Sequence, residues 1–325
     1  MKYPLVTIVL PTYNRAAVLP YALQSVVNQT YENWELIVVD DNSSDSTPSV
    51  FRDIEDGRVK YFRNENNLKL PRSLNRGFEN SKGKLLTWTS DDNIYAPNSL
   101  ERMVHHLVKN ESDFVYADYW EFSETDKDGK PLNPRRQHLS SDLQLEQGNH
   151  IGACFLYTKE LYDKIGEYDP ELFLVEDFDF FIRAAKLFRF SHVPESLYYF
   201  RRDDETLYYS RYCEVKASDV LVRYKNGLID IETAAKTLTI LLTENLSGLK
   251  NPALRLLHDR IAERSFKLSH VYRKILKRHF FNRIRGELGT IFPDYGSGQP
   301  SFVETRDEIC KLMKRIKIES EIRPQ

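Results

Sequence analysis

The sequence predicts an α/β domain on a mainly parallel sheet, followed by a smaller α-helical region. In residues 1–210, short β-branched runs alternate with helix-like segments, which is the pattern of βαβ units. From residue 211 to 325 such strand runs become rare, and residues 216–290 look helical throughout. The charge changes as well, because residues 255–285 carry ten basic and two acidic side chains, a local charge of +8 in a chain of net charge −2. We therefore expect a domain boundary near residue 211.

The first two strands have the strongest patterns. Residues 6–10 form a fully apolar, β-branched run, as expected for a parallel strand buried on both faces. Apolar residues then recur at helical spacing over residues 19–27. A second strand is predicted at residues 35–40, and the polar loop 41–48 after it holds several candidate N-caps for the next helix.

The remaining elements continue the alternation. Strands are predicted at residues 59–62, 85–89 and 114–119, with helices at 71–80 and 97–109 between them. Further elements are a polar excursion at 127–147, a helix at 178–188 and a strand-like run at 197–200.

Ligands of parallel sheets bind beyond the carboxyl ends of the strands. That rule places residues 11–15, 40–45 and 90–93 on one rim of the sheet. Three loops that meet there predict a nucleotide site.

Composition narrows the class of protein. The net charge of −2 argues against a nucleic-acid partner, and the aromatic content of 12% favours a Tyr-rich core over sugar stacking. The three cysteines form no CxxC pair, which indicates reduced thiols and a cytoplasmic location rather than a disulfide scaffold or a zinc site. No run approaches the ~18 apolar residues of a membrane-spanning helix, and the first residues lack the pattern of a signal peptide.

Two acidic clusters are the most informative feature. Asp91 and Asp92 follow a predicted strand, and Glu176 and Asp177 begin a predicted helix. A metal site facing a general base would have these groups, and such a pair can move a group from a phosphate ester to a hydroxyl. A solvated acidic turn and a cluster of helix-capping acids are the structural alternatives.

Five ordered motifs resemble those of the family 2 glycosyltransferases, which are inverting enzymes with the GT-A nucleotide-binding fold. The resemblance covers about residues 4–205 and leaves the helical tail outside. The motifs lie at residues 6–15, 38–45, 90–97, 151–169 and 176–177.

The resemblance implies which residues bind the nucleotide, and these are Pro11, Tyr13, Arg15, Asp41, Lys69 and Asp91. An aspartate at the place of Asp41 accepts a hydrogen bond from the base, commonly from the N3–H of uracil. Alternatively, residues 40–46 would cap the next helix. Base binding by Asp41 and helix capping by other residues of the loop are compatible. For Lys69, the alternative is an exposed lysine without a role in binding.

The same resemblance implies the reacting groups. Asp92 would bind Mn2+ or Mg2+, although Asn93 stands where many relatives have a further acid. Asp177, beside Glu176, would be the catalytic base.

After these acids in the sequence, Arg201 or Arg202 would bind the diphosphate. The histidine that many relatives have near Asp203 is absent.

These motifs predict a metal-dependent inverting glycosyltransferase with a nucleotide-sugar donor, by default a UDP-sugar. The acceptor would be a cell-surface glycan or a lipid-linked precursor. The rivals are a degenerate scaffold or binding subunit and a sugar nucleotidyltransferase, and the absence of glycine from residues 11–15 counts against the second. The basic helices of the tail would either contact the inner face of the cell membrane or present a solvated face.

Overall fold

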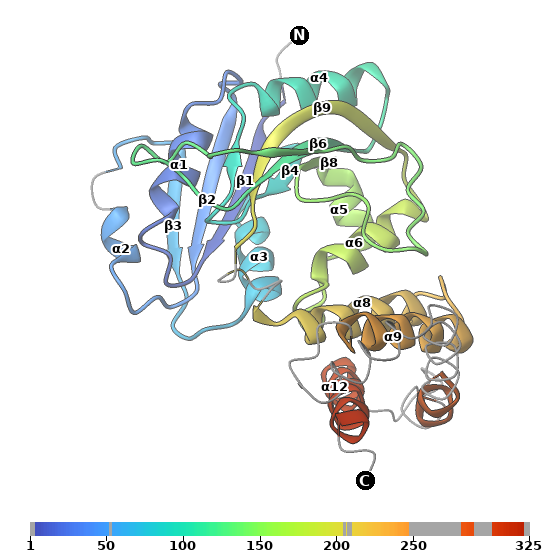
Figure 1. Ribbon diagram of the computed structural model, residues 1–325. Coiled ribbons are helices and arrows are strands. Elements are labelled where there is room, and N and C mark those ends of the chain that lie inside the picture. Colours follow the sequence, from blue (N-terminus) through green and yellow to red (C-terminus); the bar gives the residue numbers. More distant parts are fainter. Residues whose placement is uncertain are drawn as a thin grey trace. The chain divides into compact units, whose positions relative to one another are not determined.

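The computed structural model describes residues 4–51, 54–203, 206, 210–246, 281–288 and 301–321, and the chain forms two compact units, Met1–Ser210 and Arg211–Gln325. Within its described residues, the first unit is built on one nine-stranded sheet (Figure 1). The strands are β1 (Val6–Thr12), β2 (Trp34–Asp40), β3 (Val59–Arg63), β4 (Leu85–Trp88), β5 (Ile94–Tyr95), β6 (Phe114–Phe122), β7 (Arg135–Gln137), β8 (Phe155–Thr158) and β9 (Phe190–Arg201).

The strand order is β3-β2-β1-β4-β8-β6-β9-β5, with β7 paired to β6. Pairing is parallel from β3 through β2 and β1 to β4, and again between β6 and β9. Strands β8, β7 and β5 pair antiparallel with their neighbours, so these three run against the common direction of the other six. The predicted α/β fold with a mainly parallel sheet is confirmed, and β1, β2, β4 and β9 end at the same edge.

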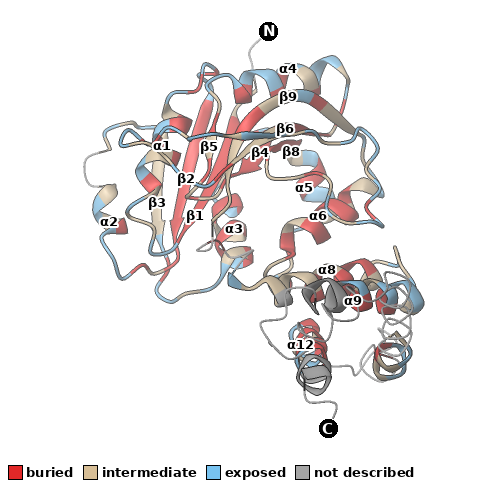
Figure 2. Cartoon of the chain, in the orientation of Figure 1, coloured by how far each residue is buried: buried red, intermediate tan, exposed pale blue. Residues whose placement is uncertain are grey.

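Helices pack on the sheet of this unit, and Figure 2 shows its central strands almost wholly buried. The helices are α1 (Leu19–Val27), α2 (Thr47–Val50), α3 (Leu70–Glu79), α4 (Ser99–Lys109), α5 (Lys159–Ile165) and α6 (Glu176–Ala185). The apolar sides of α1 and α4 share one core with Val6, Ile8 and Leu10 of β1, whose alternate side chains point to that face.

The opposite face of the sheet carries a core rich in aromatic rings. Phe180 of α6 stacks on Tyr168 with ring centroids 4.4 Å apart, and it also contacts Tyr157 of β8. These three rings are fully buried, which supports the prediction of a Tyr-rich core. On the same face α3 lies so close to β1 that a Cβ at Gly77 would meet Val9 Cγ1 at 2.3 Å.

The predicted strands and helices of this unit recur with shifts of one to three residues at most ends. Strand β9 is longer than the run expected at 197–200, since it begins at Phe190. The short strands β5, β7 and β8 and the helix α5 were not predicted. Strand β7 interrupts the excursion expected at 127–147.

The second unit is helical where it is described. Its helices are α8 (Tyr212–Lys225), α9 (Ile231–Leu246), residues 281–288 and α12 (Phe302–Glu321). Most of the basic stretch 255–285 lies outside the described residues, and with it the predicted membrane contact. In the described part of the chain, no helix is both long and apolar enough to cross a bilayer.

Candidate active site

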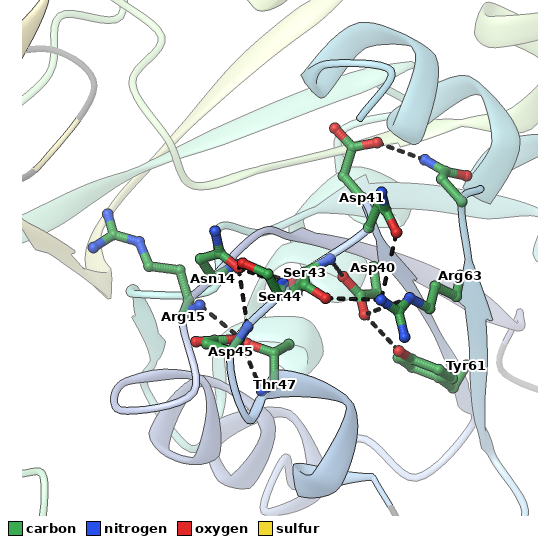
Figure 3. A network of polar contacts seen from close by, with 12 residues as sticks. Asn14, Arg15, Asp40, Asp41, Ser43, Ser44, Asp45, Thr47, Tyr61 and Arg63 are labelled. Carbon is green, nitrogen blue, oxygen red and sulfur yellow. Dashed lines mark hydrogen bonds and ion pairs between the residues drawn. The ribbon is translucent and has the colours of Figure 1, made fainter. Parts of the chain in front are cut away.

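The loops after β1 and β2 are locked together by side chains (Figure 3). Asn14, at a positive φ of 55°, donates its backbone N–H to Ser43 Oγ at 2.9 Å and accepts the Ser44 N–H at its Oδ1 at 2.7 Å. The next residue, Arg15, donates its N–H to Thr47 Oγ1 at 3.1 Å. These bonds fix the backbone of Arg15, while its guanidinium points away from the network (Figure 3).

Asp40 is a structural acid at the end of β2. Its fully buried carboxylate accepts the Ser43 N–H at 2.8 Å and the Tyr61 hydroxyl at 2.6 Å. Burial and this bond raise the pKa of Tyr61. Downstream, Asp45 Oδ1 accepts the Thr47 N–H at 2.9 Å beside the start of α2. Asp40 and Asp45 therefore stabilise turns of the loop before α2, whereas Asp41 has partners outside this loop.

The carboxylate of Asp41 is buried and fixed from two sides. Its Oδ1 accepts Asn64 Nδ2–H and the Leu68 N–H, both at 2.7 Å, and its Oδ2 accepts the Lys69 N–H at 2.9 Å. Lys69 makes this bond at φ 70° and ψ 165°, a conformation that nearly always needs glycine. A carboxylate oxygen can accept about two hydrogen bonds, so Oδ2 has room for one more donor.

The acidic loop after β4 lies against Arg15. The guanidinium Nη2 is 3.2 Å from Asp92 Oδ2, and Nε is 3.8 Å from Asp91 Oδ1. Burial and the charge of Asp92 raise the pKa of Asp91 to about 7. Burial also raises the pKa of Asp92, against the opposing effects of Arg15 and Arg201. Two neighbouring carboxylates with little access to solvent would be stabilised by further positive charge.

Arg201, the last residue of β9, reaches the same loop. It donates its backbone N–H to Asn93 Oδ1 at 2.7 Å and its Nε–H to the Asp92 carbonyl at 3.4 Å. The buried Asn93 side chain thus ties the loop to β9. Arg202 pairs instead with Glu121 of β6 at 2.6 Å. Arg201 therefore contacts the acidic loop through two hydrogen bonds.

Glu176 and Asp177 begin α6 and differ in their surroundings. Glu176 is 4% exposed, and its Oε2 accepts the Leu174 N–H at 2.8 Å. Burial and the neighbouring Asp177 charge raise the pKa of Glu176 to about 8, so this acid is mostly neutral at pH 7. Asp177 is half-buried and accepts the Phe178 N–H at 2.7 Å. Leu174 has a φ of 88°, a strained value of the kind found at functional sites.

One electrostatic effect and one hydrogen bond relate Asp177 to the part of the unit that holds the acidic loop. Tyr168 lies near enough to Asp177 for that charge to contribute, after burial, to the raised pKa of the phenol. The Tyr168 oxygen accepts the Trp88 Nε1–H at 3.1 Å. Trp88 is the last residue of β4, three positions before Asp91. The base candidate and the acidic pair therefore belong to one region of the unit.

The acidic loop fits a divalent ion that is held partly by its substrate. No group of three or more His, Cys, Asp or Glu side chains in the described residues is arranged to hold a metal. Mg2+ needs no such group, because one or two carboxylates with substrate phosphates and water complete its shell. The carboxylate oxygens of the buried Asp91 and the half-buried Asp92 are hard donors of that kind.

The other predicted nucleotide residues lie around these groups. Pro11 is buried within β1, opposite Val39, and Tyr13 is 47% exposed at the end of that strand. The Lys69 side chain is exposed, while its backbone serves Asp41.

Sequence reasoning missed three asparagines of the site. They are Asn14, which joins the loops, Asn64, which holds Asp41, and Asn149, which donates to Asp177. Asn14 lies within the first motif, where the tolerance of asparagine for positive φ gave a signal. Asn64 and Asn149 are distant in sequence from their partners and gave none.

Comparison with known proteins agrees with this geometry. The family model described as Glycosyl transferase family 2 matches residues 7–166. An uncharacterized glycosyltransferase of Haemophilus influenzae is 31% identical over 57% of this chain and 74% of its own length. RP339 of Rickettsia prowazekii, also an uncharacterized glycosyltransferase, is 32% identical over 64% of each chain.

A further relative has a named reaction. Escherichia coli WfgD, a UDP-Glc:alpha-D-GlcNAc-diphosphoundecaprenol beta-1,3-glucosyltransferase, is 32% identical over 41% of this chain and 52% of its own length. Across the Rickettsia relatives the matched region spans 28% to 64% of their length.

Solved structures show the same fold. S. aureus TarS 1-349 in complex with UDP-GlcNAc superposes with a TM-score of 0.55, at 16% identity, over 91% of this chain and 98% of TarS 1-349. The mannosyltransferase PcManGT from Pyrobaculum calidifontis, in complex with GDP-Man and Mn2+, gives a TM-score of 0.54 at 16% identity, over 87% and 86% of the two chains. Both neighbours are GT-A enzymes, so the predicted GT-A fold is confirmed.

Proposed function

Because the chain belongs to glycosyl transferase family 2, we propose that it transfers a sugar from a nucleoside diphosphate sugar to an acceptor hydroxyl with inversion. The observation that carries this proposal is the arrangement of acids. The half-buried carboxylate of Asp177 begins α6, and the neighbouring carboxylates of Asp91 and Asp92, both beside Arg15, follow β4 in the same unit. A base and a diphosphate site in one region are what a single displacement requires.

The donor is by default a UDP-sugar. Asp41 Oδ2 has room for one more hydrogen-bond donor, and the N3–H of uracil is such a donor, whereas N3 of cytosine is an acceptor. WfgD is named as a glucosyltransferase that uses UDP-Glc, and the TarS structure is a complex with UDP-GlcNAc, which supports uracil. Guanine also carries a ring N–H, and PcManGT binds GDP-Man, so GDP is the competitor to be tested.

A divalent ion, Mn2+ or Mg2+, would be held by Asp92 with Asp91 beside it. When bound, it would neutralise the charge of the diphosphate leaving group. The Mn2+ of PcManGT supports this choice. The raised pKa values of both carboxyls express the same need for positive charge in this loop.

The side chains of the chain itself would do the rest. Arg15 and Arg201 both lie against the acidic loop and would bind the diphosphate oxygens, Arg15 by exchanging its ion pair with Asp92 for one with phosphate. Asp177 would take the proton of the acceptor hydroxyl as that oxygen attacks the anomeric carbon and the bond to the diphosphate breaks. Burial favours the neutral form of Glu176 by raising its pKa, so this acid adds less negative charge beside Asp177.

The acceptor is a hydroxyl of a cell-surface glycan or of its lipid-linked precursor. Support comes from WfgD, which is named for a diphosphoundecaprenol-linked GlcNAc acceptor. We place the reaction in the cytoplasm or at the inner face of the cell membrane, where nucleotide sugars are available.

Asp177→Asn tests the role of the base. It should lower the rate of UDP release from UDP-sugar and acceptor by about 10²–10⁴-fold while leaving the Kd for UDP unchanged. Asp163→Asn, on the exposed side of α5, is the matched control and should leave both values unchanged. Full activity in Asp177→Asn would remove Asp177 as the base. A wild-type protein that binds UDP-sugars but never turns over with any glycan acceptor would favour a scaffold function.

A further inference from the structure

We propose that Asn149 is a positioning residue for Asp177, one that orients the carboxylate and favours its ionised form. The inference rests on the proposed function, in which Asp177 is the base, and it adds a residue that no motif indicated. Asn149 lies in the connection between β7 and β8, 28 positions before Asp177.

The first observation is a direct contact. Asn149 Nδ2 donates to Asp177 Oδ2 at 3.2 Å. The other end of the same amide, Oδ1, accepts the Ile151 N–H at 3.2 Å. Because an acceptor faces a backbone donor at one end, the amide must present its NH2 group to Asp177.

The second observation is that the backbone next to Asn149 is tightly packed. Ile151 is fully buried, and Gly152 at a φ of 73° brings the backbone against Tyr119, whose Cε1 would be 3.0 Å from an added Cβ. The backbone that holds Asn149 is thus anchored to β6. An exposed side chain that is fastened in this way can keep its partner in one orientation.

The third observation concerns the two oxygens of the base. Oδ1 of Asp177 accepts the Phe178 N–H at 2.7 Å, while Oδ2 accepts from Asn149. Donors on both oxygens fix the plane of the carboxylate. Each donor also favours the charged form, so removing one should raise the pKa of the base.

The titratable groups around Asp177 set the background for such a shift. Glu176 and Asp179 share its helical turn, and the charge of Asp177 also acts on the pKa of Tyr168, which burial raises. Asp179 pairs with Arg183 at 2.7 Å, and Glu176 is buried against the Leu174 N–H. Asn149 adds an uncharged side-chain donor to this acidic surrounding.

The first test compares pH profiles in the full-length protein. Asn149→Ala should lower kcat/KM for transfer by about 10–100-fold and move the acid limb of the kcat/KM profile up by about 0.5–1 pH unit, with the Kd for UDP unchanged. Asn149→Asp, which places a like charge beside the base, should move that limb further, and Asn149→Gln should restore part of the loss. Gln147→Ala, an exposed residue of the same segment, is the control.

The second test does not depend on turnover. A titration of the Asp177 side-chain carboxyl by ¹³C NMR should give a higher pKa in Asn149→Ala than in the wild type, and the same pKa in Gln147→Ala. An unchanged Asp177 pKa would overturn the inference, as would an unchanged acid limb in Asn149→Ala. A shifted pKa in a protein that transfers no sugar would instead leave the positioning intact and refute the proposed function.

Discussion

Replacing Glu176 by glutamine should stabilise the protein in mild alkali and not in mild acid. Glu176 is 4% exposed, and burial with the neighbouring charge of Asp177 raises its pKa from 4.5 to about 8. The folded state therefore binds this proton more tightly than the unfolded chain does. Its contribution to the free energy of unfolding is fully present below pH 4.5 and falls as the pH rises, until it is lost above pH 8.

The size of the effect follows from the two pKa values. Their difference corresponds to about 5 kcal/mol in all, and about half of this falls between pH 6 and pH 9. Glutamine has the same shape and no charge, so Glu176→Gln should lack this loss. For a domain of this size, that half corresponds to about 5–10 °C in Tm.

Thermal unfolding of both proteins at pH 6 and at pH 9 measures the effect. The difference in Tm between Glu176→Gln and the wild type should grow by about 5–10 °C from pH 6 to pH 9. Glu171→Gln, an exposed residue in the loop before α6, should show no such growth. A difference for Glu176→Gln that is the same at both pH values would refute the reasoning, because it would mean that Glu176 titrates alike in both states.

Three further substitutions probe the fold and the donor site. Gly77→Ala should lower the free energy of unfolding by about 1–3 kcal/mol in a denaturant titration, since its Cβ would overlap Val9; an unchanged midpoint would contradict the close packing of α3 on β1. Asp118→Asn should cost about 1–3 kcal/mol at pH 7, because the buried carboxylate accepts bonds from two histidine rings and a backbone N–H. These bonds, against the effect of burial, lower the pKa of Asp118, so its stabilisation is lost only as the pH falls below 3.8, where the difference from wild type should shrink. Asn64→Ala should weaken UDP binding about tenfold in calorimetry by freeing the Asp41 carboxylate, and equal affinity would show that Asp41 does not depend on that bond.

The parallel half of the sheet could be predicted because burial on both faces leaves a plain pattern. Strands β1 and β2 are buried at every position, and their sequences are correspondingly apolar runs. Because ligands bind beyond the carboxyl ends of parallel strands, the loops after β1, β2 and β4 were expected to meet at one edge of the sheet. The ion pair between Arg15 and Asp92 joins two of these loops.

The short strands β5 and β7 and the first half of β9 could not be predicted, for physical reasons. Strand β5 has two residues and β7 has three largely exposed polar ones, so neither shows a period. The first half of β9 contains Pro194, which a regular central strand excludes. The register with β6 shifts between the pairs Ala117↔Val193 and Asp118↔Ser196, and this irregularity accommodates the proline.

The candidate site was predictable in its acids and not in the groups that hold them. Asp41, Asp92 and Asp177 stand within motifs, whereas Asn64 and Asn149 meet their partners only through the tertiary fold. Lys69 was predicted either to bind the nucleotide or to be an exposed lysine; its side chain is exposed, and its backbone N–H, at a strained φ of 70°, donates to Asp41.

Calorimetric titration with UDP, GDP and dTDP, each with and without Mn2+, tests the proposed donor site most directly. We expect Mn2+-dependent binding of UDP that is lost in Asp92→Ala, because Asp92 is the carboxylate proposed to hold the ion. Binding of GDP alone would keep the site and change the donor. Absence of binding for all three nucleotides, with and without Mn2+, would contradict the proposed transferase function.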